Sequence, residues 1–188
     1  MEKRGRAGLE SLAADLAADR VGAFPRLVAA LQDGVYSGAL RLTGSRPDAE
    51  EVVQEAFIRA YRALGRYPAE QVAALHLQEW MWSIAANLCR NQARSRRRRP
   101  TGEPAAADLL PDPAPGPEQQ AVAASERERL AAHLARLPWA QREAVVLRHV
   151  AGLSYAEAAA ALGRPAGTVK SDVHRGLQRL RLSLEEEP

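Results

Sequence analysis

The sequence predicts an all-α protein made of two small helical domains joined by a flexible acidic linker. Apolar residues recur at spacings of three and four, period-two clusters of β-branched and aromatic residues are absent, and prolines concentrate in one central segment. The 188 residues are 46% hydrophobic and 26% charged, which suits one medium domain or two small ones. We expect an N-terminal extension with a short amphipathic helix at residues 1–23 and a first module at residues 24–99. A linker would follow at residues 100–125, and a second module at residues 126–188.

The distribution of charge separates the same parts. Residues 1–99 contain 16 basic and 11 acidic residues, residues 100–125 contain four acidic residues and no basic one, and residues 126–188 contain ten basic and eight acidic residues. The central segment also holds six of the twelve prolines and no aromatic residue, so it cannot bury enough apolar surface to fold alone. Fully extended, it would span at most about 90 Å. We therefore expect two basic modules with separate cores that can hold two separated DNA sites.

Capping signals place the expected helices. Pro25 suits the first turn of a helix that Gly44 ends, and a second helix begins between Ser45 and Asp48 and ends at Gly65. The segment between the second and third helices shows no clear pattern. The expected helices cover residues 26–42, about 46–64 and 77–94 in the first module, and 118–136, 139–150, 155–162 and 168–183 in the second.

The second module contains a helix-turn-helix pattern. Ser154 and Glu157 form a capping box at the start of one helix, and Gly163 ends that helix before a short turn. In the following helix an apolar stripe is expected to face inward, made of Val169, Val173, Leu177 and Leu180. The outward residues suit contacts with base edges and phosphates, although a merely solvated face is the alternative. The candidate DNA contacts of this module are Arg164, Thr168, Lys170, Ser171, His174 and Arg175, with Gln178 on the same face.

The second helix of the first module carries an acidic strip around one apolar residue. Its members are Asp48, Glu51, Gln54, Glu55 and Ile58. Such a strip is a plausible docking surface for a basic partner helix. The alternative is that these acidic residues bind no partner and only stabilise the start of the helix, where the helix dipole favours negative charge.

The third helix of the first module runs into five arginines within residues 94–99. The positive charges of such a run repel one another in isolation, and binding to nucleic-acid phosphates relieves this repulsion. We expect its inward side to contain Leu77, Trp80, Met81, Ile84 and Leu88. The other side combines an indole, an amide and guanidinium groups, which suits unpaired bases. Its candidate DNA contacts are Trp82, Asn87, Arg90, Arg94, Arg97 and Arg98; the alternatives are that Trp82 packs inward and that the arginines form a solvated tail.

Several classes of function are not supported by the sequence. No apolar run is long enough to span a membrane, and the charged first twenty residues lack the apolar core of a signal peptide, so we expect a cytoplasmic protein. A single cysteine, Cys89, and four histidines without metal-ligand spacing predict no disulfide, metal or other cofactor. No P-loop, dinucleotide glycine pattern or nucleophile elbow is present, and we expect no enzyme activity.

These motifs together resemble the bacterial sigma factors of the extracytoplasmic-function (ECF) group. Residues 48–64 look like the region-two helix that docks on the clamp coiled coil of RNA polymerase, and residues 80–87 are similar to the helix that melts and reads the −10 promoter element. Residues 137–143, 152–157 and 167–171 look like region four, which reads the −35 element. The helix-turn-helix alone is shared with response-regulator output domains, whereas both halves in this order are specific to sigma factors.

The resemblance implies a non-enzymatic promoter-specificity subunit. Its partners would be core RNA polymerase, through the clamp coiled coil and the flap, promoter DNA, and an anti-sigma factor. Gln54 and Glu55 would be the principal polymerase contacts, and Asn87 would contact the non-template strand at −10. The acidic linker would pass near the RNA path of the polymerase.

The sequence departs from the family pattern at three places. Residues 68–77 form a longer stretch without the Arg-Gly pattern, ending in an aromatic residue, with which the family often captures a flipped promoter base, so this sequence does not predict whether a base is captured here. Asp172 stands where an arginine is common, so it either faces a cytosine or caps a neighbouring basic group. Arg164 replaces an apolar turn residue and is expected to gain a phosphate contact.

Two other functions fit parts of the sequence. A free-standing DNA-binding regulator would use the first module for dimerisation or sensing and would protect a promoter without polymerase. A helical enzyme is the more remote alternative, because the catalytic motifs sought above are missing.

Overall fold

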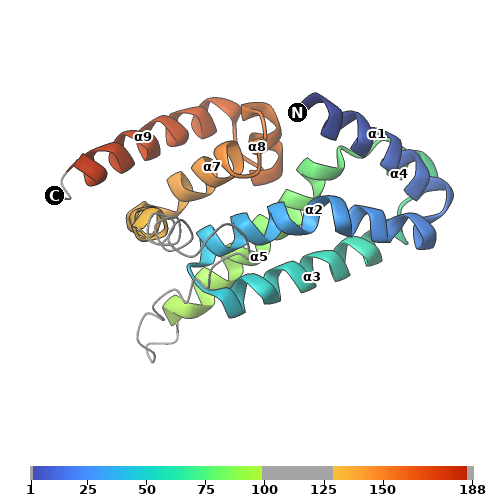
Figure 1. Cartoon of the computed structure of the whole chain (residues 1–188), viewed down its shortest axis with the longest axis horizontal. Helices are drawn as coiled ribbons and strands as arrows, with labels where there is room; N and C mark the ends of the chain where they lie inside the picture. The colour runs from blue at the N-terminus through green and yellow to red at the C-terminus, as the bar shows by residue number, and fades with distance from the viewer. Residues whose placement is uncertain (1, 99–128, 186–188) are drawn as a thin grey trace, which may run out of the picture.

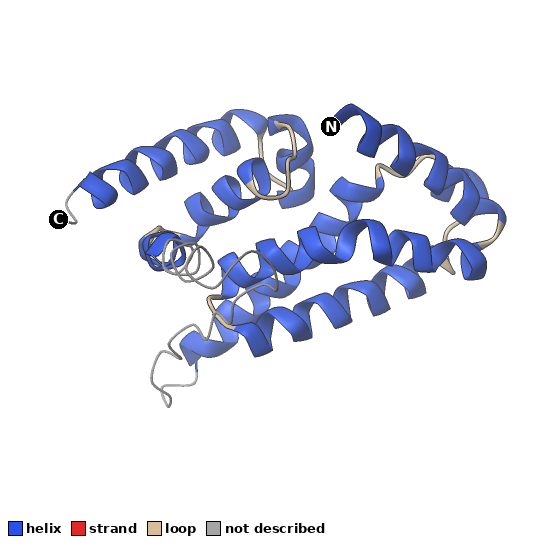
Figure 2. Ribbon diagram, in the orientation of Figure 1, coloured by secondary structure: helices blue, strands red, loops and turns tan. Residues whose placement is uncertain are grey.

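The computed structural model describes residues 2–98 and 129–185, and the structural statements below concern these residues. Helices make up almost all of this part of the chain, and no strand occurs in it (Figure 2). The predicted all-α class is confirmed. The linker and the start of the helix expected at 118–136 lie outside the described residues, whereas residues 129–136 are helical.

The N-terminal module contains five helices in the described residues. They are α1 (Glu2–Ala18), α2 (Arg20–Thr43), α3 (Arg46–Leu64), α4 (Ala69–Ala73) and α5 (Leu77–Arg98). The helices α2, α3 and α5 lie side by side, and α1 packs against α4 and α2 (Figure 1). The segment without a clear pattern thus contains the short helix α4. The expected amphipathic helix near the N-terminus is confirmed as α1, which buries Leu12, Ala13 and Leu16.

The helix ends of this module follow their caps. Ser45 caps α3 as predicted, because its hydroxyl accepts from the Asp48 amide at 3.4 Å, and Gly44 adopts φ 67° at the end of α2. The predicted start of α2 at residue 26 is wrong. The Asp19 carboxylate accepts from the Gly22 amide at 3.0 Å and starts the helix six residues earlier, so that Pro25 lies within it.

The C-terminal module contains helical residues 129–136 and the helices α7 (Trp139–His149), α8 (Tyr155–Leu162) and α9 (Ala166–Glu185). The predicted capping box is confirmed. The Ser154 amide donates to Glu157 Oε2 at 2.7 Å, and the Glu157 amide donates to Ser154 Oγ at 3.2 Å. Gly163 adopts φ 61° and ends α8, so that α9 starts after a tight turn.

The inward face of α9 differs from the prediction at one position. Leu177 is 41% exposed, so its expected burial is wrong. Gly176 faces inward instead and allows close approach to α7, because a Cβ there would lie only 2.7 Å from Val145 Cγ2. The remaining apolar members of the stripe, Val169, Val173 and Leu180, are buried as predicted.

The two modules pack against one another, contrary to the expectation of separate cores. One cluster of buried apolar residues continues from α2 and α5 into α7 and α8. Three polar contacts cross the same interface: Gln78 Nε2 donates to the Ala151 carbonyl at 2.6 Å, Arg142 Nη1 donates to the Leu42 carbonyl at 3.2 Å, and Arg90 pairs with Glu143. We call this contact the intermodule interface.

Candidate nucleic-acid and partner-binding surfaces

A groove of about 450 Å³ lies between α3 and α5. Four of the five residues predicted for partner docking line it, namely Glu51, Gln54, Glu55 and Ile58. The groove has an apolar floor that includes Val52 and Leu88, and the exposed Ile58 side chain lies at its rim. An acidic, partly apolar groove of this kind fits a helix with basic and apolar residues.

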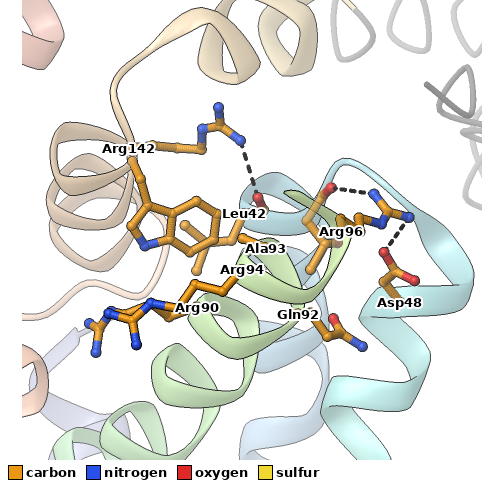
Figure 3. Close-up of a pocket in the computed structure, with 10 residues that line it drawn as sticks. Leu42, Asp48, Arg90, Gln92, Ala93, Arg94, Arg96 and Arg142 are labelled. Carbon is orange, nitrogen blue, oxygen red and sulfur yellow. Dashed lines mark hydrogen bonds and ion pairs between the residues drawn. The ribbon is translucent and has the colours of Figure 1, made fainter. Parts of the chain in front are cut away.

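The acidic residues of the strip differ in their contacts. Glu55 pairs with Arg59 at 2.7 Å one turn away, and Glu51 accepts from Gln92 Nε2 at 3.0 Å. Both contacts are solvent-accessible, so a partner can compete for these carboxylates at little cost. Asp48 is not part of the groove. It forms an ion pair with Arg96 and lines a different cavity at the intermodule interface (Figure 3).

Trp82 is buried, so the prediction that it contacts DNA is wrong for this structure. Its side chain is 2% exposed, and a Cβ at Gly38 of α2 would overlap the indole ring. Gly38 therefore makes the room that lets this indole pack against α2. Trp80 and Ile84, both predicted to be buried, are only partly buried, and Trp80 packs against Tyr67 in an edge-on geometry.

On α5, Asn87 and the arginines Arg90, Arg94 and Arg96 keep at least part of their surface exposed. Asn87 is exposed, and its Oδ1 accepts from Arg90 Nη1 at 2.8 Å. Arg94 is exposed at the edge of the interface cavity. Arg96 pairs with Asp48 and donates to the Thr43 carbonyl at 3.4 Å. The side chains of Arg97 and Arg98 lie outside the described residues.

Arg90 is engaged by the other module. Its Nη2 lies 2.9 Å from Glu143 Oε1, and its side chain is 24% exposed, whereas that of Glu143 is 3% exposed. Burial raises the pKa of the Glu143 carboxyl above its ordinary value, although Arg90 acts in the opposite direction. Burial also raises the pKa of the neighbouring Cys89 to about 12, so this thiol is unreactive.

The helix α9 presents the predicted polar face without obstruction. Thr168, Lys170, Ser171, His174 and Arg175 are all exposed on this helix. Ser171 Oγ donates to the Gly167 carbonyl at 2.9 Å. Within the described part of the chain, neither Lys170 nor Arg175 forms an ion pair. The second helix of the helix-turn-helix is therefore free to enter a DNA groove.

Arg164 and Asp172 form an ion pair, which decides between the two roles considered for Asp172. Asp172 is buried and caps the guanidinium of Arg164 rather than facing a base. Arg164 also donates to the Ala140 carbonyl at 3.3 Å. The expected phosphate contact of Arg164 is not supported, because its guanidinium is used to join the turn to α9 and α7.

The sequence did not predict that Gln78, Arg142 and Glu143 join the two modules. Gln78 was not distinguished from other polar residues of the predicted helices, and Arg142 and Glu143, within residues 137–143, were assigned only to the region-four resemblance. Their only signal is positional, since each is a polar residue beside a run of buried apolar residues. Among the described residues, no group of three or more histidine, cysteine or carboxylate side chains could hold a metal ion, and no helix could cross a membrane.

Comparison with known families matches both modules. A model of sigma-70 region 2 matches residues 27–99, and a model of sigma-70 region 4 matches residues 127–180. The chain is 32% identical over 166 residues to the ECF RNA polymerase sigma-E factor of Haemophilus influenzae, covering 84% of the chain and 85% of that relative. The chain belongs to the ECF sigma factors. Proteins of this family direct promoter-specific transcription and bind core RNA polymerase and promoter DNA.

Other relatives support the same sigma-factor family. The chain is 39% identical over 159 residues to ECF RNA polymerase sigma factor SigE of Mycolicibacterium smegmatis, which covers 84% of the chain but only 60% of that longer relative. Among solved structures, CnrH in complex with the cytosolic domain of CnrY superposes with a TM-score of 0.72 at 26% identity, over 95% of this sigma factor and 98% of CnrH. The sigma factor RpoE of Bartonella quintana, solved with the anti-sigma factor NepR, superposes with a TM-score of 0.70 at 25% identity, over 88% and 98% of the two chains.

Proposed function

We propose that this sigma factor docks on core RNA polymerase through the groove between α3 and α5. The observation that carries the proposal is the gathering of Glu51, Gln54, Glu55 and Ile58 around one cavity. The acidic rim would attract a basic partner helix, and the apolar floor would accept its apolar residues. The clamp coiled coil is the partner that the family resemblance implies.

The two helices α5 and α9 would then contact the promoter. On α9, Thr168, Lys170, Ser171, His174 and Arg175 would read or flank the major groove at −35. On α5, Asn87, Arg90 and Arg94 would contact the −10 strand, with Arg97 and Arg98 as further candidates. The roles first expected for Trp82 and Arg164 are not part of this proposal.

The chain would act without an active site of its own, as a specificity subunit whose chemistry belongs to the polymerase. Sigma factors act with polymerase, and the chain would therefore act in the cytoplasm. An anti-sigma factor is a further expected partner, since the sigma factor RpoE of Bartonella quintana was solved in complex with one.

Charge reversal at Glu55 tests the docking site. We expect Glu55→Lys to lower the affinity for core polymerase by at least about 100-fold, because a basic partner would meet a like charge in the groove. Affinity for purified core enzyme and promoter-specific transcription in vitro are measured together. Glu50→Lys is the matched control, since Glu50 is exposed on α3 but does not line the groove. Equal core affinity of the Glu55→Lys variant and the wild type would contradict the docking assignment.

A further inference from the structure

The helix α9 packs along α7 (Figure 1), and the side of α9 that faces α7 carries two charged residues. Asp172, Gly176 and Arg179 follow one another at spacings of four and three, so they lie on the same side of the helix. Gly176 allows close approach, because a Cβ there would lie 2.7 Å from Val145 Cγ2. Arg179 Nη1 donates to Gln141 Oε1 at 2.9 Å. This side of α9 is therefore held on α7 by directional polar contacts as well as by close packing.

The turn before α9 is tied to the same side of the helix. Arg164 pairs with the buried carboxylate of Asp172, and its guanidinium also donates to the Ala140 carbonyl of α7 at 3.3 Å. The Arg164 amide donates to the Ala159 carbonyl of α8 at 3.0 Å. Arg164 thus joins all three helices of the helix-turn-helix and its support, and Asp172 is the group on α9 through which it does so.

From this geometry we infer that Arg164 and Asp172 are positioning residues that set the base preference of α9 without touching DNA. The inference rests on the proposed function in one respect, the reading of the −35 element by α9. The ion pair fixes the rotation of α9 about its own axis, and this rotation decides which base edges Lys170, Ser171 and His174 meet.

Small rotations of a recognition helix have large effects on hydrogen bonds. A helix with its side chains is about 10–12 Å wide, so a rotation of about 10° moves a side-chain tip by about 1 Å. The lengths of good hydrogen bonds to bases span only about 0.5 Å. The apolar contacts of Val169 and Val173 tolerate such a shift because hydrophobic contact has no preferred direction, whereas a guanidinium and a carboxylate pair in a fixed geometry. The polar contacts are therefore the part of the packing that specifies the rotation.

Selection of promoter sequences tests the inference. Holoenzyme is assembled from core polymerase and the full chain, and it is offered a promoter that the wild type uses, with the −35 base pairs randomised. The templates retained in open complexes are sequenced. Arg164→Gln and Asp172→Asn each remove the ion pair from one side with little change in size. Arg181→Gln is the matched control, because it breaks an exposed ion pair with Glu185 further along the same helix.

Both variants are expected to change the preference at several −35 base pairs and to change it in the same way. The enrichment of the preferred bases should fall roughly five-fold, because several base contacts are misplaced together. The double variant Arg164→Gln, Asp172→Asn should show no further change, since the two substitutions remove one interaction. It also leaves no unpaired charge in the turn, which favours a folded C-terminal module. The control should select the same sequences as the wild type.

Direct DNA contacts of these residues give different results. A phosphate contact of Arg164 would make Arg164→Gln weaken all templates alike, and a base contact of Asp172 would confine the change in Asp172→Asn to one base pair. Either result would overturn the inference, as would an unchanged preference in all three variants.

Circular dichroism during thermal unfolding separates positioning from stability. If the C-terminal module were unfolded even in the double variant, the ion pair would serve stability alone and the inference would be wrong. A wild-type chain that selects no −35 bases would refute the proposed role of α9 itself, and the inference with it. Wild-type preference that persists in every variant refutes the inference only.

Discussion

The helices α5 and α9 were both expected to present a DNA-contacting face, but in the structure only the face of α9 is open to solvent, whereas arginines of α5 are paired within the chain. On α9, the polar residues point to solvent and Lys170 and Arg175 have no ion-pair partner in the described residues. On α5, Arg90 is held by Glu143 and Arg96 by Asp48. Sequence periodicity therefore locates a polar face, but it does not show whether another part of the chain already occupies that face.

Truncation of two apolar residues gives the largest contrast between the helices. Trp82 was predicted to be outward on α5 and Leu177 inward on α9, and the structure reverses both. We expect Trp82→Ala to lower the free energy of unfolding by about 3–5 kcal/mol, since it leaves a cavity against Gly38. Leu177→Ala should cost less than about 1 kcal/mol. Denaturant unfolding of both variants provides the measurement, and a larger loss for Leu177→Ala would contradict the described packing.

Removal of the two basic side chains on α9 tests the open face. We expect the double variant Lys170→Ala, Arg175→Ala to reduce transcription from a −35-dependent promoter about 100-fold, because each lost base or phosphate contact costs about 1–3 kcal/mol. Affinity for core polymerase should stay at the wild-type value. Arg181→Ala is the control, since Arg181 is highly exposed further along the same helix. If this control were as defective as the double variant, the defect would reflect lost charge in general rather than groove contacts.

Local signals predicted most of the fold. The Ser154–Glu157 capping box, the Ser45 cap and the left-handed glycines Gly44 and Gly163 fix helix boundaries through contacts within a few residues. Such signals are contained in the local sequence, and the structure reproduces them. The predicted start of α2 is wrong because two local signals for a helix start occur there. The helix begins after the Asp19 cap rather than at Pro25.

The features that the sequence did not predict depend on tertiary packing. Trp82 is buried because Gly38, 44 positions earlier, leaves space for its ring, and Glu143 pairs with Arg90, 53 positions earlier. The Arg164–Asp172 pair was one of two predicted possibilities, and only the fold of the turn decides between them. The same holds for the docking groove: α3 alone predicts its acidic strip, but the cavity exists only because α5 lies alongside.

The smallest expected effect concerns the pH dependence of the intermodule interface. Burial raises the pKa of Glu143 in the closed arrangement, so this arrangement binds the Glu143 proton more tightly than an open one in which the carboxyl is hydrated. The resulting stabilisation is fully present below the ordinary carboxyl pKa, about 4.5, and is lost as the pH rises through the raised pKa of the closed state. We expect energy transfer between fluorophores at two exposed positions, Glu70→Cys in the N-terminal module and Leu182→Cys in the C-terminal module, to decrease as the pH increases over this window.

Glu143→Gln separates this effect from the titration of other carboxyls. The amide has nearly the same shape but no ionisable proton, and Arg90 and Arg164, the cations acting on Glu143, keep their charge throughout this range. Energy transfer in the variant should therefore lose the dependence that Glu143 contributes and keep only what the remaining carboxyls supply. An identical pH profile in the wild type and the variant would show that Glu143 is hydrated in both arrangements. The face of α5 would then be covered, unlike that of α9, because of the hydrogen bonds of Gln78 and Arg142 and the apolar packing between the modules, rather than because of the buried carboxylate.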